Sequence, residues 1–367
     1  MSLNFRRFRS AVVTASAAAI AATAALVPTA SAATLTPQQV AGNAPQSVVS
    51  DLEVTPAVAD RTWFQKFGND PRVLKLQATS PAMNGRVVPL AVIPAGEPGR
   101  PTIYLLNGAG GAEQQQDWLT MSQLVDFYAD KKVNVVVPQA GAFSYYTDWI
   151  SEPNGAYLKG PQKWETFLTK ELPGPLEARL GANNKRAIAG MSMSAGSAFS
   201  LAQHNQGFYD AVGSFAGCGL TAYPLQYEFV RVTVNRGGAQ PEQMWGPMGS
   251  DTNRWNDAFM NAEQLRGTEL YISSASGLAA EQDLPGYYIQ RGYDPLVSTI
   301  GSAQLIIEGG IIEAAVNNCT HMMKAQLDKK GIPADYNFRN TGTHSWPGWR
   351  EDIEKSWGTF WRAFYAK

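Results

Sequence analysis

Histidine and cysteine are scarce in this 367-residue chain, which has three histidines and two cysteines. Their spacing matches no metal-binding pattern, so we expect no metal, and no motif implies an organic cofactor. Excess basic charge is also missing, since 30 lysines and arginines face 31 acidic residues, which argues against a nucleic-acid partner. Beyond the first 32 residues no apolar run reaches the roughly 18 positions of a membrane span, so we expect no transmembrane segment.

The first 32 residues have the composition of an export signal. Three arginines in MSLNFRRFRS precede an alanine-rich apolar stretch that ends at Ala30-Ser31-Ala32, a small-residue pattern typical of signal peptidase sites. We therefore predict a signal peptide over 1–32 and a mature protein that is secreted or held at the cell envelope. A retained N-terminal anchor is the alternative.

The rest of the chain predicts one α/β domain. Residues 33–70 are rich in proline, alanine, serine and glutamine, which predicts an N-terminal extension or linker before a catalytic domain over 71–367. Five β-type runs are expected at 100–108, 132–139, 185–192, 210–217 and 268–277. Stretches with apolar residues at helical spacing separate them, and the last 18 residues predict a closing helix. This alternation indicates a mostly parallel sheet covered on both faces.

Residues 190–197, GMSMSAGS, join a predicted buried strand to a predicted helix. A nucleophile elbow requires such a turn, with small residues two positions before and after the nucleophile. Ser192 and Ser194 both meet this requirement. Ser192 is the first serine after the strand and therefore lies at the apex, which favours it as the nucleophile. A small-residue turn that serves only close packing is the alternative interpretation.

A serine nucleophile needs a general base, and His344 is the best-placed histidine. It lies in a loop between a β-like segment and the last helix, and the order serine, acid, histidine is that of α/β-hydrolases. His204 and His321 lie in predicted helices, where surface or capping roles are more common. The acid must fall between Ser192 and His344. Position alone leaves three candidates, Asp283, Glu308 and Glu313.

A glycine-rich loop follows the first of the five expected strands. Its residues, Asn107 to Gly111, are small enough for backbone N–H groups to approach a ligand. Because it precedes the elbow at the place where α/β-hydrolases keep an oxyanion donor, we expect it to supply one.

Several longer motifs carry a family resemblance. They are YLLNG (104–108), FSYYTDW with EPNG (143–155), KWETFLTKELP (163–173), GMSMSAGSA (190–198), MWGP followed by WND (244–257) and TGTHSW (341–346). With them the chain resembles the secreted mycolyltransferases of the antigen 85 type, from about Val73 to the C-terminal helix. The resemblance implies the α/β-hydrolase fold.

The resemblance also assigns site residues. It places the nucleophile at Ser192, the base at His344 and the acid at Glu313, with Glu308 as the fallback. It places the oxyanion donors at the N–H groups of Ala109 and Met193. The implied substrate-contact positions are Asn107, Ser144, Ser345 and Trp346.

The implied activity is acyl transfer in cell-envelope assembly. A mycoloyl chain would pass from trehalose monomycolate through a serine acyl-enzyme to an acceptor hydroxyl of trehalose, arabinogalactan or a protein. The expected partners are thus trehalose mycolates, an acceptor sugar or protein, and the envelope surface. A secreted carboxylesterase with the same triad and a non-catalytic envelope- or matrix-binding protein are the rival functions.

Two departures from the family pattern matter. The family usually has Asp-Gly-Leu-Arg where this chain has Asn107-Gly108-Ala109-Gly110, so a carboxylate and an arginine that would grip trehalose are missing. This favours an acceptor other than trehalose as a hypothesis. The cysteines also differ from the family's common pair. Because an exported protein permits oxidation, a Cys218–Cys319 disulfide that holds the helix of the acid against the sheet is a second hypothesis.

Two aromatic-rich stretches, 143–149 and 284–296, are candidate walls of a lipid groove. Core packing is the more common use of such residues.

Overall fold

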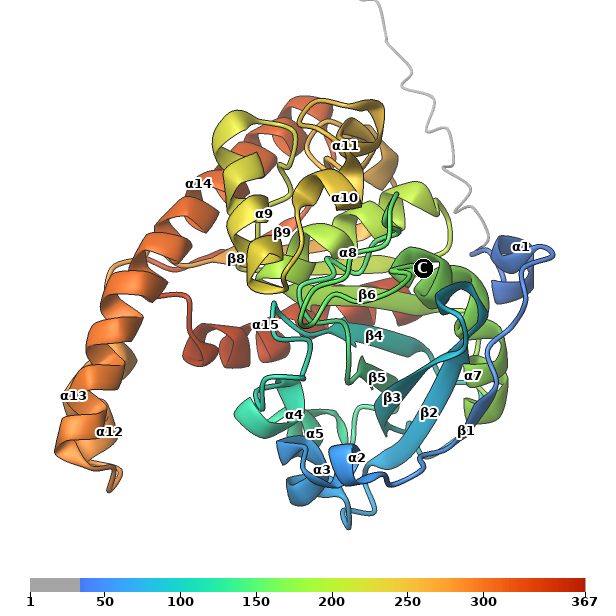
Figure 1. Cartoon of the computed structure of the whole chain (residues 1–367), viewed down its shortest axis with the longest axis horizontal. Coiled ribbons are helices and arrows are strands. Elements are labelled where there is room, and N and C mark those ends of the chain that lie inside the picture. Colours follow the sequence, from blue (N-terminus) through green and yellow to red (C-terminus); the bar gives the residue numbers. More distant parts are fainter. Residues whose placement is uncertain (1–33, 367) are drawn as a thin grey trace, which may run out of the picture. The chain divides into compact units, whose positions relative to one another are not determined.

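A computed structural model of the protein describes residues 34–366, and the predicted signal peptide lies outside these residues. Nine strands form one sheet in the order β1-β2-β3-β5-β4-β6-β7-β8-β9 (Figure 1). The strands are β1 Val49–Asp51, β2 Leu74–Ser80, β3 Arg86–Ile93, β4 Thr102–Leu106, β5 Asn134–Pro138, β6 Arg186–Met191, β7 Ala211–Phe215, β8 Glu269–Ser274 and β9 Asp335–Phe338.

The sheet has a parallel part and an antiparallel part. Strands β4 to β9 pair in parallel, whereas β1, β2 and β3 pair antiparallel with one another and β3 pairs antiparallel with β5. The five runs expected from the sequence are β4 to β8. Parallel strands end at the same edge, so the loops after β4, β6, β7 and β8 meet at the carboxyl edge of the sheet.

The helices are shorter and more numerous than the apolar spacing suggests. They are α1 Pro37–Ala41, α2 Pro56–Ala59, α3 Thr62–Phe67, α4 Trp118–Met121, α5 Leu124–Tyr128, α6 Trp164–Thr166, α7 Pro173–Leu180, α8 Met193–His204, α9 Pro224–Arg236, α10 Pro241–Trp245, α11 Asp251–Trp255, α12 Pro285–Ile289, α13 Pro295–Gln304, α14 Gly310–Lys330 and α15 Trp346–Tyr365. Single turns with 3₁₀ pairing lie at Pro81–Met83, Ala262–Leu265 and Glu281–Asp283, and turns with π pairing at Phe167–Glu171 and Leu305–Gly309.

Both faces of the sheet are covered by apolar side chains. Along β4, Ile103 and Leu105 point to one face and Tyr104 and Leu106 to the other, as the two-residue period of a strand requires. Helices α7 and α8 pack on the face of Tyr104, and α3, α4, α5 and α15 on the opposite face. Every residue of β4, β5, β6 and β7 is buried, which explains why the sequences of these central strands are mainly apolar.

The N-terminal segment is not the linker expected from its composition. Strand β1 extends the sheet by pairing with β2, and the side chains of Trp63 and Phe67 are buried in the core beside β3. The composition was misleading because proline here begins short helices at Pro37 and Pro56, the first helical position that proline tolerates.

The sequence predicts no membrane span, but one helical segment has the length and hydropathy of one. Within residues 34–366, the stretch Pro295–Lys330 is long and apolar enough to cross a membrane, and only 22% of its most apolar window is buried. Glycines 301, 309 and 310 and Glu308 interrupt its apolar residues, so no unbroken run is visible in the sequence. Its C-terminal half packs on the domain through Cys319, Met323 and Leu327, which are buried. Length and composition alone therefore do not make it a membrane span.

The burial of α15 predicts unequal effects of two neighbouring substitutions. Phe360 is 1% exposed and lies in the core, whereas Trp361 is 48% exposed. Phe360→Ala should lower the free energy of unfolding by about 3–5 kcal/mol, because it removes apolar contacts and leaves a cavity. The matched change Trp361→Ala should cost about 1 kcal/mol or less. Urea unfolding of both variants measures the difference, and equal losses would contradict the packing described here.

Candidate active site

Ser192 lies at the apex of the turn between β6 and α8. Its backbone has φ 55° and ψ −119°, a conformation that non-glycine residues rarely adopt. The Ser192 N–H donates to Phe215 O at the end of β7 over 2.9 Å, which holds the strained turn to the sheet. Such strain at a turn is typical of a functional site, because the surrounding fold must maintain it.

Small residues make this turn possible. A Cβ atom on Gly190 would lie 2.4 Å from Ser194 O, and a Cβ atom on Gly217 would lie 2.5 Å from Ser192 O. The Ser194 hydroxyl is buried beneath the turn, where it accepts from Met191 N and lies 3.1 Å from Met191 O. The structure therefore places Ser194 in the support of the turn and Ser192 at its apex.

His344 connects Ser192 to a buried carboxylate. His344 Nε2 lies 2.7 Å from Ser192 Oγ, and His344 Nδ1 lies 2.7 Å from Glu313 Oε2. The Glu313 side chain is 1% exposed, and its other oxygen accepts from Ala275 N at 2.6 Å. The three side chains thus have the hydrogen-bonded arrangement that a nucleophile, a base and an orienting acid would require.

The backbone holds the histidine loop from several sides. His344 N donates to Gly309 O over 3.0 Å, and the imidazole meets the Trp349 ring edge to face at 5.0 Å. Asp283, which is fully buried, accepts from Thr343 Oγ1 and Ser345 Oγ on either side of His344. Asp283 is thus a positioning residue for the loop, a role that its place in the sequence did not indicate.

The other candidates from the sequence lie apart from Ser192. Glu308 is exposed and accepts from Gln304. His204 pairs with Glu165 and stacks on Trp255, and His321 Nδ1 lies 2.9 Å from Asn317 O.

The expected oxyanion donors lie at the cavity beside Ser192. Ala109 follows β4, and Met193 is the first residue of α8, whose N-terminal N–H groups have no partner one turn earlier. The partial positive charge at the start of a 12-residue helix favours an anion at this position.

Three of the four predicted substrate-contact residues have buried side chains that are hydrogen-bonded within the protein. Asn107 is 1% exposed, donates to Pro138 O and accepts from Trp118 N, so its side chain braces the loop. Ser144 is fully buried and donates to Gly141 O, and the Ser345 hydroxyl donates to Asp283. Trp346 is half-buried, and its indole N–H is 3.3 Å from Gln116 Oε1, so its side chain is the most accessible of the four.

An apolar cavity of about 290 Å³ opens at Ser192 and His344. Its apolar lining comprises Met193, Leu220, Phe229, Val230, Val232, Ile311, Ile312, Ala315 and Val316. Arg236 adds a positive charge, and Tyr145 adds a phenol whose pKa burial raises to about 12. Tyr145 is therefore neutral at physiological pH and does not compete as a base. Sequence reasoning missed this lining because α9 and α14 contribute it from distant segments.

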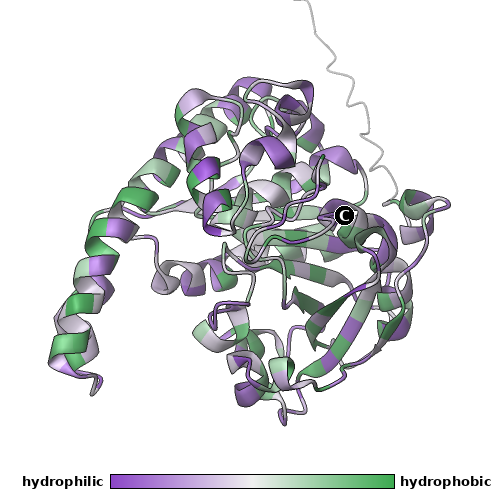
Figure 2. Cartoon of the chain, in the orientation of Figure 1, coloured by the Kyte–Doolittle hydropathy of each residue, from purple (hydrophilic) through white to green (hydrophobic). Residues whose placement is uncertain are grey.

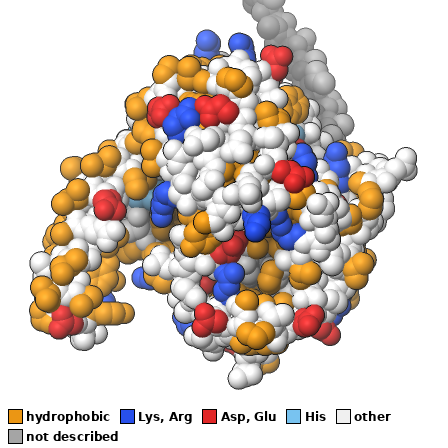
Figure 3. All heavy atoms as spheres, viewed as in Figure 1, with side chains coloured by type: hydrophobic (Ala, Val, Ile, Leu, Met, Phe, Trp, Pro, Cys, Tyr) orange, Lys and Arg blue, Asp and Glu red, His pale blue; other side chains and the backbone are white. Residues whose placement is uncertain are grey.

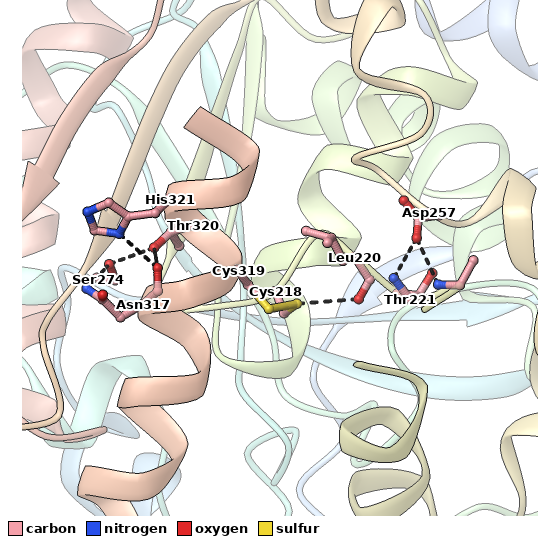
Figure 4. The surroundings of a disulfide bond; sticks show 10 residues. Cys218, Leu220, Thr221, Asp257, Ser274, Asn317, Cys319, Thr320 and His321 are labelled. Carbon is pink, nitrogen blue, oxygen red and sulfur yellow. Dashed lines mark hydrogen bonds between the residues drawn. A yellow bond between two sulfur atoms is a disulfide. The ribbon is translucent and has the colours of Figure 1, made fainter. Parts of the chain in front are cut away.

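A disulfide fixes α14 beside the catalytic loops. Cys218, which follows β7, is bonded to Cys319 of α14 (Figure 4). On the same helix, Asn317 Nδ2 donates to Ala275 O, and the Ser274 and Thr320 hydroxyls lie 2.8 Å apart. Glu313 lies two turns before Cys319, so these links hold the helix of the carboxylate against the end of β8.

No metal site is evident in the described part of the chain. Among residues 34–366, no three histidine, cysteine, aspartate or glutamate side chains lie together in a way that could hold a metal ion.

Comparison with known proteins identifies the family. The family model "Putative esterase" matches residues 80–360. The chain belongs to this esterase family. It is 27% identical over 281 residues to diacylglycerol acyltransferase/mycolyltransferase Ag85B of Mycobacterium leprae, covering 75% of this chain and 79% of the relative. It is 26% identical over 276 residues to Ag85A of Mycobacterium tuberculosis, covering 75% and 76%. The resemblance to antigen 85 mycolyltransferases is thus confirmed.

Solved structures confirm the fold. MPT51 (FbpC1) of Mycobacterium tuberculosis aligns with a TM-score of 0.64 at 23% identity, over 80% of this chain and 98% of that protein. The serine hydrolase FphF of Staphylococcus aureus aligns with a TM-score of 0.52 at 13% identity, over 79% and 98%. The α/β-hydrolase prediction is confirmed.

The disulfide predicts a measurable contribution to stability. Cys218 and Cys319 are 101 residues apart, so their bond closes a long loop in the unfolded chain. The double change Cys218→Ser and Cys319→Ser should lower the free energy of unfolding by about 2–5 kcal/mol. Dithiothreitol should lower the Tm of the wild type and leave the double variant unchanged. A wild-type Tm that does not respond to full reduction would contradict this.

Proposed function

We propose that this protein is a secreted serine acyltransferase of the cell envelope, which transfers a mycoloyl chain from trehalose monomycolate to an acceptor hydroxyl. The coarser class, an esterase-like enzyme that transfers acyl groups, is supported by its family and by its antigen 85 relatives. The observation that carries the finer proposal is the hydrogen-bonded series Glu313, His344, Ser192 at the mouth of an apolar cavity.

In the first half-reaction, His344 Nε2 takes the proton of Ser192 Oγ as this oxygen attacks the ester carbonyl carbon. The Glu313 carboxylate accepts the Nδ1–H of the histidine and stabilises the imidazolium that forms. The oxyanion would be bound by the N–H groups of Ala109 and Met193. His344 then returns the proton to the departing sugar oxygen, and the acyl chain remains on Ser192.

In the second half-reaction, an acceptor hydroxyl gives its proton to His344 and attacks the carbonyl carbon of the acyl-enzyme. The bond between this carbon and Ser192 Oγ breaks, and His344 returns the proton to Ser192 Oγ. The apolar lining of Phe229, Val232, Ile311 and Ile312 favours an alkyl chain over a polar ligand. The acceptor is trehalose, arabinogalactan or a protein hydroxyl. The family's Asp and Arg correspond to Asn107, which is buried, and Gly110 in this chain. These two positions therefore offer no charged side chain to bind trehalose.

The nucleophile assignment predicts a covalent intermediate. After incubation with trehalose monomycolate, the wild type should gain the mass of one mycoloyl group and Ser192→Ala should not. Ser194→Ala should still form the adduct, because Ser194 supports the turn from below. Intact-mass spectrometry makes the measurement, and an adduct that persists in Ser192→Ala would show that another residue is acylated.

The same adduct separates the rival activities. An acyltransferase should lose the mycoloyl group faster after addition of its acceptor than in buffer alone, whereas a carboxylesterase should lose it equally fast in both. A non-catalytic binding protein should form no adduct at all.

The acid assignment predicts different effects for two neighbouring glutamates. Glu313→Gln keeps the shape of the side chain but removes the charge that stabilises the imidazolium. We expect kcat on a soluble ester to fall by roughly 10³–10⁴-fold. Glu308→Gln changes an exposed side chain on the preceding turn and should alter kcat less than twofold. Similar losses in both variants would contradict the assignment of Glu313.

A further inference from the structure

An extended helical arm lies beyond the active site. The arm comprises residues 284–312, which include α12, α13 and the π turn before α14, and Figure 1 shows α12 and α13 at the end of α14 that is remote from the sheet. Between Leu284 and Glu308 only Ser298 and Ser302 are buried. Apart from these two serines, the side chains of this stretch are exposed or half-buried.

The arm is unusually apolar for an exposed segment. Among its exposed side chains are Leu284, Ile289, Tyr293, Leu296, Val297, Ile300, Ile307, Ile311 and Ile312. Hydrophobic residues recur along the arm in Figure 2, and their side chains are visible on its surface in Figure 3. Such a concentration on a soluble domain marks a binding surface.

The charges of the arm are few and are satisfied within it. They are Arg291, Asp294 and Glu308. Arg291 lies over the Tyr287 ring, Asp294 caps α13 by accepting from Leu296 N and Val297 N, and Glu308 accepts from Gln304. Only three ionic groups thus lie along residues 284–312, which gives little basis for recognition by a charged protein partner.

The exposed apolar residues form one stripe that leads to the active site. Leu296, Val297 and Ile300 recur at helical spacing on α13 and share roughly one face, and the exposed Ile307 and Ile311 extend the apolar surface across the π turn. At its inner end, Ile311 lines the cavity that contains Ser192 and His344. The exposed apolar surface of the arm is thus continuous with the proposed acyl site.

The outer end of the arm has features of a lipid–water interface. Three tyrosines gather there, with Tyr288 in ring contact with both Tyr287 and Tyr293. A groove of about 330 Å³ between Tyr288, Val297 and Leu305 also contains the buried hydroxyls of Ser298 and Ser302, which have no hydrogen-bond partner within the described residues. Tyrosine belts and one-sided apolar helices are typical of segments that lie in a membrane interface.

We infer that residues 284–312 dock the protein onto a lipid layer, with the apolar stripe inserted among acyl chains. The choice of a lipid rests on the proposed lipid-ester substrate, because the stripe ends at the site that would receive its acyl chain. Docked in this way, the arm gives a chain in the layer an apolar route to Ser192.

The test measures vesicle binding with catalysis removed. The parent protein is the full mature chain carrying Ser192→Ala, and the arm variant carries Leu296→Asp and Ile300→Asp in addition. Each is mixed with phosphatidylcholine vesicles, and the bound fraction is measured by flotation. The matched control carries Val48→Asp and Val54→Asp, which are 67% and 54% exposed in the N-terminal segment. We expect the parent and the control to float and the arm variant to bind at least tenfold more weakly. A parent that stays unbound, or an arm variant that floats equally well, would overturn the inference.

Two further measurements keep folding and catalysis separate. With Ser192 intact, the arm variant should hydrolyse a soluble short-chain ester at the wild-type rate and lose at least tenfold on a vesicle-embedded ester. The tryptophan fluorescence of a Leu296→Trp variant should be quenched by brominated phosphatidylcholine, and no quenching would count against insertion.

If the parent is a dimer that the arm variant splits, and neither binds vesicles, the arm binds a second copy and the inference is wrong. If wild type floats but forms no acyl adduct, docking stands and the proposed function fails.

Discussion

The rest of the site depends on the two hydrogen bonds of the Glu313 carboxylate. It lies on α14 and joins two other segments, because one oxygen accepts from Ala275 N after β8 and the other faces His344 Nδ1. The Glu313 side chain is 1% exposed, so these two hydrogen bonds replace the water that burial removes from its oxygens. The disulfide at Cys319 and the hydrogen bond from Asn317 hold α14 where both donors reach the carboxylate.

The strain at Ser192 is balanced by close packing. Its positive φ is imposed because β6, β7 and α8 approach so closely that Gly190 and Gly217 have no space for a side chain. On the opposite side, Asp283 and Gly309 O hold the His344 loop by its backbone and its flanking hydroxyls. The serine and the histidine are therefore oriented independently, and their 2.7 Å contact results from two rigid supports.

The sequence predicted what local pattern and motif spacing encode. The five apolar strands are continuous because each is buried on both faces, and the order of Ser192 and His344 follows the order of the loops at one sheet edge. Segments whose structure depends on distant partners were missed. Strand β1 exists only because β2 pairs with it, and Ser144 and Ser345 face internal acceptors that no local pattern reveals. The choice of Glu313 over Asp283 came from the family resemblance, since position in the sequence alone left both open.

The π turn at Leu305–Gly309 separates two functions of one helical segment. Before it, the exposed arm carries the apolar stripe, and after it, α14 is fixed to the domain from Glu313 to Leu327. Such turns weaken the regular i to i−4 pairing and are frequent at functional sites. On the inner side of the turn, the contacts of Ala275, Asn317 and Cys319 keep the carboxylate in place. Ile311 follows this turn and lines the cavity, and His344 N donates to Gly309 O at the end of the turn, so the inner end of the arm, the cavity and the histidine loop meet at one short segment.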